Sequence, residues 1–210
     1  HRISTVRQFS LYLVRLGCDA YVPHERFGAK HTSYFSPRIL TYAEVEALLQ
    51  AVDQLTPSAH APMRHIVMPE VFRLLYGCGF RVSEVLNLRV RDVDLNQGIL
   101  TVRDGKLGKD RLVPASTALI KRLQAYAVHC EDQSPDAAFF PSRRNEPWSI
   151  QTTYFLFRKL LYRCGIIHGG RGKGPRLHDL RHTFAVHRLI QWYREGADLN
   201  AKLPLLATYL

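Results

Sequence analysis

Apolar residues recur along most of this 210-residue chain at the three- and four-residue spacing of an amphipathic helix. One clear helix start is Thr41, because Glu44 three residues later completes a capping box. Pro69 lies inside an apolar run and predicts a kink there. The predicted helices cover residues 3–16, 41–52, 63–76, 81–88, 117–130, 149–163, 177–195 and 203–210.

A second pattern, alternation of apolar and polar residues, predicts short strands at 99–103 and 111–114. Residues 104–110 between them are the expected tip of a hairpin, and residues 94–98 form a turn before it. The four glycines within 168–175 predict a loop. The predicted fold class is mainly α with a small antiparallel β-sheet, an α+β domain.

A long stretch without a hydrophobic period follows the first predicted helix. Residues 17–36 carry Pro, Gly, His and aromatic residues without a period, which is typical of a linker. The expected organisation is one helix plus a linker at 1–36 and a main domain at 37–210.

The charge balance predicts a polyanionic partner. Lys and Arg number 29 against 18 Asp and Glu, a net charge of +11. No apolar run reaches the length of a membrane span, and no basic amphipathic helix suggests a membrane surface. The basic residues gather in loops: Arg103, Lys106, Lys109, Arg111, Arg143, Arg144, Arg171, Lys173 and Arg176. We expect all of these except Lys106 to contact double-stranded DNA.

The four cysteines are far apart and form no C-x-x-C pair, so neither a structural zinc site nor a disulfide framework is predicted. Cys78 and Cys130 lie in apolar helical segments, where buried free thiols are the default. Reduced cysteines fit a cytoplasmic protein, and DNA binding would associate it with the nucleoid.

Arg81 stands just after Gly77 and Gly79, at the start of a predicted short helix. There its guanidinium can grip an anion with two parallel hydrogen bonds, and Glu84 three residues later can hold it in position. A plain surface salt bridge between Arg81 and Glu84 is the alternative, and both can hold.

His178, Arg181 and His182 share one face of a predicted helix, opposite Leu180 and Phe184. Such a polar stripe on a helix buried at its back suits an active site. A solvated basic face is one alternative. A metal pair from the two histidines is another, but it lacks the glutamate of H-E-x-x-H and a third ligand.

Lys106 belongs to the predicted hairpin tip, where an ammonium group can protonate a leaving oxygen as general acid. A solvated turn lysine is the usual alternative. Lys109 is equally basic, so the chemistry alone leaves the choice between them open.

Three stretches together resemble the tyrosine recombinase/integrase family, in particular its Xer-type members. They read G-x-G-x-R-x-S-E at 77–84, G-K-x-x-K-x-R-x-V-P at 105–114 and H-x-L-R-H-T-F-A at 178–185. The resemblance covers about 35–210 and implies the family's DNA breaking–rejoining catalytic domain. Residues 1–36 look like the last helix of a core-binding domain plus the interdomain linker.

The resemblance implies catalytic roles for Arg81, Lys106, His178 and Arg181 on one solvent-accessible basic surface. It implies supporting roles for Glu84 and His182, and no cofactor or metal. The family also needs a Leu-Gly-His step followed by a tyrosine nucleophile, and 207–210 resembles the lead-in to that step. On this reading Tyr209 is no nucleophile, and the chain is an incomplete catalytic domain that binds DNA without cutting it.

The full-length parent is then expected to recombine or integrate DNA through a 3′-phosphotyrosine as a tetramer, and the fragment to be monomeric. A type IB topoisomerase-like enzyme uses the same residues. A non-catalytic DNA-binding protein, such as a relic or regulator, is the alternative from another class. A metal-dependent nuclease is less consistent with the scattered acidic residues.

Overall fold

The computed structural model describes the chain except residues 1, 25–35, 104–109 and 171–172, and it forms two compact units, His1–Ser36 and Pro37–Leu210. The first unit contains helix α1 (Arg2–Arg15). The division coincides with the expected boundary, but the assignment of 1–36 to a core-binding domain stays a prediction. None of the described helices combines the length and hydrophobicity that crossing a membrane requires.

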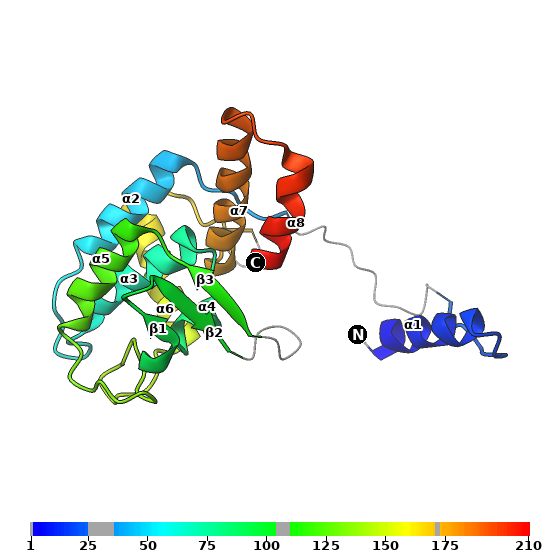
Figure 1. Ribbon diagram of the computed structural model, residues 1–210, viewed down its shortest axis with the longest axis horizontal. Coiled ribbons are helices and arrows are strands. Elements are labelled where there is room, and N and C mark those ends of the chain that lie inside the picture. The colour runs from blue at the N-terminus through cyan, green and yellow to red at the C-terminus, as the bar shows by residue number, and fades with distance from the viewer. Residues whose placement is uncertain (1, 25–35, 104–109, 171–172) are drawn as a thin grey trace. The chain divides into compact units, whose positions relative to one another are not determined.

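The second unit is mainly helical with one three-stranded antiparallel sheet in the order β1-β2-β3, which confirms the predicted fold class (Figure 1). The strands are β1 (Val93–Asp94), β2 (Ile99–Val102) and β3 (Arg111–Pro114). The helices are α2 (Tyr42–Asp53), α3 (Arg64–Gly77), α4 (Val82–Leu86), the 3-10 turn η2 (Val90–Asp92), α5 (Thr117–Ala127), α6 (Ile150–Arg163), α7 (Leu177–Arg194) and α8 (Leu199–Tyr209).

Helix α3 is the centre of the core, since Val67 to Phe72, Leu74 and Leu75 are all buried. Helices α2, α5 and α7 pack against it. The predicted capping box at the start of α2 is present: Thr41 Oγ1 accepts from the Glu44 amide at 3.1 Å, and Glu44 Oε2 accepts from the Thr41 amide at 2.7 Å. The Cys78 thiol is buried as predicted, while Cys130 is only half-buried.

The β2–β3 hairpin has the predicted strands, with Val102 opposite Arg111 and Ile99 opposite Pro114. Its expected tip lies outside the described residues. Strand β1 was not predicted, because two residues are too few to show an alternating pattern.

Gly79 allows the loop before α4 to approach α7. Its φ is +63°, and a Cβ added there would lie 2.6 Å from Cδ1 of Phe184. Glycine is therefore required twice over, by the backbone conformation and by the space.

Helix α8 packs beside α7 (Figure 1). It begins at Leu199, one turn before the predicted start at 203. Asp198 caps it by accepting from the Asn200 amide at 2.9 Å, and Pro204 lies inside the helix. The prediction overlooked the cap at Asp198, which determines where this helix begins.

Candidate active site

A single carboxylate, that of Glu84 on α4, organises the basic residues of the site. Glu84 Oε1 accepts from Arg81 Nη1 at 2.5 Å and from Arg111 Nη1 at 2.8 Å. Glu84 Oε2 accepts from the Arg81 amide at 2.8 Å and from Arg111 Nη2 at 2.7 Å. Burial acts to raise the pKa of Glu84, but the hydrogen bonds from Arg111 and Arg81 outweigh it and lower the pKa to about 2. Glu84 is therefore ionised at neutral pH.

Arg81 is the N-cap residue of α4, and its side chain is 31% exposed. Both readings offered by the sequence hold here: Arg81 forms a salt bridge with Glu84, and part of its guanidinium still faces solvent. This is the arrangement that a fixed anion-binding arginine needs.

Arg181 on α7 reaches the same cluster from the other side. Its Nη1 donates to the carbonyl oxygen of Gly79 and lies 4.0 Å from Glu84 Oε2, and its Nη2 donates to the carbonyl oxygen of Leu210. The residue is buried, at 7% exposure, which corrects the expectation of a solvent-accessible side chain. The Gly79 loop and the end of α8 cover the Arg181 side chain. These contacts come from distant parts of the chain, so the spacing of residues along α7 could not predict them.

Burial lowers the pKa of Arg181 to about 10, and repulsion from Arg81 adds to this effect while Glu84 opposes it. Arg181 still carries its charge at neutral pH. Its chemical role is therefore electrostatic, as a donor to negative oxygens, and not as a proton carrier.

His178 and His182 lie side by side on α7 as predicted, with ring centroids 4.8 Å apart and planes nearly perpendicular. Partial burial is the largest cause that lowers the pKa of His178, followed by the neighbouring His182 and the nearby arginines. A neutral imidazole at this place can accept a proton from a reacting hydroxyl. Among the described residues no three His, Cys, Asp or Glu side chains gather as a metal site would require.

Three acidic residues cap the starts of helical segments in the same way. Glu84, Asp92 and Asp179 each accept from the backbone amide of the arginine three positions earlier, at 2.8, 3.0 and 3.0 Å. Asp92 and Asp179 were not predicted as site residues, although the R-x-x-D spacing is the signal that could have found them. Both are buried, so they shape the backbone around the site.

His187 on α7 has the environment of a structural histidine. Its Nδ1 lies 2.9 Å from the Tyr76 hydroxyl, and its ring stacks on Tyr42 at 3.8 Å. Thr183 on the same helix accepts from the Leu40 amide at 3.1 Å. These contacts fix α7 to the start of the domain.

The arginines predicted to contact DNA differ in their surroundings. Arg111 is only 17% exposed and gives both terminal nitrogens to Glu84, while its guanidinium lies over the Phe80 ring, 5.9 Å from the centroid. This differs from the expected surface residue. Arg103 is 46% exposed, and its Nε donates to the buried Asp92 at 2.5 Å.

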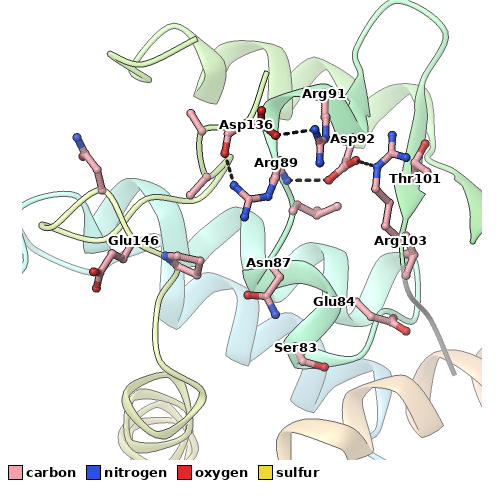
Figure 2. A pocket seen from close by; sticks show the side chains of 16 residues that line it. Ser83, Glu84, Asn87, Arg89, Arg91, Asp92, Thr101, Arg103, Asp136 and Glu146 are labelled. Atoms are coloured by element: carbon pink, nitrogen blue, oxygen red, sulfur yellow. Dashed lines mark hydrogen bonds and ion pairs between the residues drawn. The ribbon is translucent and has the colours of Figure 1, made fainter. Parts of the chain in front are cut away.

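Figure 2 shows Arg103 and Asp92 with Arg89, Arg91 and Asp136 along a groove of about 660 Å³ that Glu84 also lines. Each arginine drawn there is held by an acidic residue or its backbone. Elsewhere Arg143, Arg144 and Lys173 are exposed, and Arg176 is half-buried. Lys106, Lys109 and Arg171 lie outside the described residues.

Tyr209, the tyrosine that follows Thr208 on α8, points into the protein. Its ring packs against Phe184, with centroids 5.8 Å apart. Burial raises the pKa of the Tyr209 hydroxyl, and the adjacent Cys78 raises it further. A hydroxyl with a raised pKa ionises less readily than a free tyrosine, and the expectation that Tyr209 does not attack DNA stays a prediction.

Comparison with known proteins gives a consistent result. Residues 38–201 match the phage integrase family. The chain is 35% identical over 212 residues to the integrase/recombinase y4rE of Sinorhizobium fredii, covering 100% of this chain and 67% of that protein. It is 34% identical to the tyrosine recombinase XerD of Pseudomonas aeruginosa, covering 97% of this chain and 64% of that protein.

Solved structures agree. The crystal structure of XerA recombinase superposes with a TM-score of 0.60 at 28% identity, covering 93% of this chain and 62% of that chain. A lambda integrase dimer bound to a COC′ core site shares the fold, with a TM-score of 0.61 at 18% identity over 95% of this chain and 68% of that one. The chain thus spans about two-thirds of the length of these relatives. With this fold and this match over most of its length, the chain belongs to the phage integrase family of tyrosine recombinases.

Proposed function

We propose that this chain supplies the catalytic domain of a site-specific recombinase that breaks and rejoins DNA through a 3′-phosphotyrosine. One observation carries the proposal: Arg81 and Arg181, far apart in the sequence, meet at the Glu84 carboxylate with His178 beside them. Cleavage of a phosphodiester passes through a five-coordinate phosphorus with added negative charge. Two fixed guanidinium groups stabilise that charge, each by about 3 kcal/mol in a water-poor site.

Each residue has a role in this proposal that follows from its chemistry. Arg81 donates to the non-bridging oxygens of the scissile phosphate, and Arg181 joins it once its Nη2 leaves the Leu210 carbonyl oxygen. His178, neutral at pH 7, moves protons at the attacked or released oxygen. Lys106 is proposed as the general acid for the 5′-oxygen. Glu84 holds Arg81, and His182 orders His178.

Double-stranded DNA is the proposed partner. The net charge of +11 favours it, and relatives of the same fold, such as XerH with difH and lambda integrase with its core site, have been solved on DNA. The exposed Arg143, Arg144 and Lys173 are suited to the DNA backbone. We also propose that the full-length protein assembles as a tetramer on DNA and is associated with the nucleoid.

The test is binding of a fluorescein-labelled duplex to this chain at rising salt. The logarithm of the association constant should fall linearly with the logarithm of the salt concentration. Arg81→Gln should reduce that slope by about 1, because one phosphate contact is lost. Arg73→Gln is the matched control, since Arg73 pairs with Asp53 on α2. Binding that ignores salt, or a slope that Arg81→Gln leaves unchanged, would contradict the proposal.

Two alternatives are separated by the products of the full-length protein. Relaxation of supercoiled plasmids of any sequence would indicate a type IB topoisomerase-like enzyme. Site-specific binding without cleavage would indicate a non-catalytic DNA-binding protein. Recombination between two copies of one specific site is the result that the proposal predicts.

A further inference from the structure

The guanidinium of Arg111 is committed to one partner. Arg111 is the first residue of β3, and its position opposite Val102 is fixed by the register of the hairpin. Its Nη1 and Nη2 donate to the two oxygens of Glu84 at 2.8 and 2.7 Å. Its Nε is buried with no hydrogen-bond partner among the described residues, and the side chain is 17% exposed. Little of Arg111 is therefore available to a bound DNA.

The same carboxylate is what holds Arg81. Glu84 Oε1 is shared by Nη1 of Arg81 and Nη1 of Arg111, and Oε2 is shared by the Arg81 amide and Nη2 of Arg111. The four hydrogen bonds use the whole accepting capacity of the carboxylate. The orientation of Glu84, and with it the direction of Arg81, thus depends on both arginines.

Arg111 also sets the charge of the cluster. Glu84 carries one negative charge among the three guanidinium groups of Arg81, Arg111 and Arg181. With Arg111 in place the Glu84 charge is neutralised by a residue that does not face the substrate. Without it, Glu84 would be paired only with Arg81 and Arg181 and would weaken their attraction for a phosphate.

We propose that Arg111 is a positioning residue of the recombination site: by gripping Glu84 from strand β3, it fixes Arg81 toward the scissile phosphate and leaves the charge of Arg81 free for it. This inference rests on the proposed function of Arg81. It replaces the direct contact between Arg111 and DNA that the sequence suggested. Through Glu84, Arg111 also joins strand β3 of the hairpin to helix α4, because Arg111 and Arg81 bind the same carboxylate.

The first test measures Glu84 itself. A carbon-13 NMR titration of the Glu84 carboxyl should show a midpoint near 2 in the wild-type chain. Arg111→Met should raise this midpoint by about 1 to 3 pH units, because the arginine side chain that donates to both carboxylate oxygens is removed. Arg111→Lys should give an intermediate rise, since lysine keeps the charge but loses the two parallel hydrogen bonds. An unchanged midpoint in Arg111→Met would overturn the proposal.

Arg73→Met is the matched control for that titration. Arg73 donates to both oxygens of Asp53 at 2.8 and 2.6 Å, and its side chain is 16% exposed, so it is a similar pair on α3. It should leave the Glu84 midpoint unchanged. If Arg111→Met does not fold by circular dichroism, Arg111→Lys carries the test, and a wild-type midpoint in that variant overturns the proposal.

The second test asks whether Arg111 acts through Arg81. Binding of a fluorescein-labelled duplex should weaken on the order of tenfold in Arg111→Met. In the Arg81→Gln background the same change should have no further effect. Effects that multiply in the double variant would mean that Arg111 contacts DNA directly and would overturn the positioning role.

The two tests separate the two proposals. Wild-type binding by Arg81→Gln would remove the proposed function of Arg81, and the positioning role would fall with it. An unchanged Glu84 titration in Arg111→Met, together with weaker binding by Arg81→Gln, would remove the positioning role and leave the proposed function standing.

Discussion

Arg181 Nη1 lies 4.0 Å from Glu84 Oε2, within the range of strong attraction but beyond a hydrogen bond, while the guanidinium donates to the carbonyl of Gly79. Helix α7 and helix α4 are therefore coupled by charge, with the Gly79 backbone between them. Since Glu84 also binds Arg81 and Arg111, one carboxylate holds together three cations that would otherwise repel one another.

Replacing this carboxylate should cost stability. Glu84→Gln removes the charge and leaves three neighbouring guanidinium groups uncompensated, so we expect unfolding in urea to require about 2 kcal/mol less free energy. Glu46→Gln is the control, because Glu46 is exposed on α2 and should change stability by less than about 0.5 kcal/mol. Equal effects of the two changes would contradict the central place of Glu84.

The contribution of Glu84 should depend on pH. Its pKa is lowered from 4.5 to about 2, first of all by Arg111 against the opposing effect of burial. The stabilisation is complete only well above pH 4.5, where the unfolded state no longer binds a proton at this carboxyl, and it is lost as the pH falls toward 2. The stability difference between wild type and Glu84→Gln should therefore shrink between pH 5 and pH 3. A constant difference over that window would show that Glu84 is not held by charge.

Gly79→Ala should destabilise the domain by about 2 to 4 kcal/mol, because the positive φ strains an alanine and its Cβ would collide with Phe184. Gly196 provides the control: its φ is +71°, but a Cβ there meets nothing within 4 Å. Gly196→Ala should cost only the backbone strain of about 1 kcal/mol. Thermal unfolding of both variants separates strain from collision, and equal losses would mean that the Phe184 contact carries no weight.

His178 should titrate below the usual histidine range in proton NMR, because burial, His182 and the nearby arginines all oppose its positive charge. His182→Ala should raise the pKa of His178 by removing one of these causes. His129→Ala, at an exposed site, should leave it unchanged. A lower pKa of His178 in His182→Ala would contradict the assignment of His182 as a residue that lowers this pKa.

The local signals in the sequence predicted most of the fold. The capping box at Thr41 and the strands of the hairpin are visible within a few residues, because caps and alternation are local features. The start of α8 was placed one turn late, at Leu203, because the Asp198 cap was not recognised.

The site was predictable as a set of residues and not as a set of contacts. The spacing of His178, Arg181 and His182 predicts that they share one helix face. The burial of Arg181 depends instead on contacts with the Gly79 loop and with α8, which the spacing of residues along α7 cannot predict. The pairing of Arg111 with Glu84 joins residues 27 positions apart through the hairpin register. A local sequence pattern does not show such tertiary pairs. For that reason Arg111, which belongs to a basic loop motif, was expected at the surface.

Covalent capture on a nicked suicide DNA substrate tests the central claim most directly. We predict that this 210-residue chain forms no adduct, because the Tyr209 hydroxyl is buried against Phe184 and Cys78. The protein extended to the length of its relatives should form a phosphotyrosine adduct, and Arg181→Ala in that protein should reduce it on the order of 10²-fold or more. An adduct mapped to Tyr209, or full adduct formation by Arg181→Ala, would contradict the account.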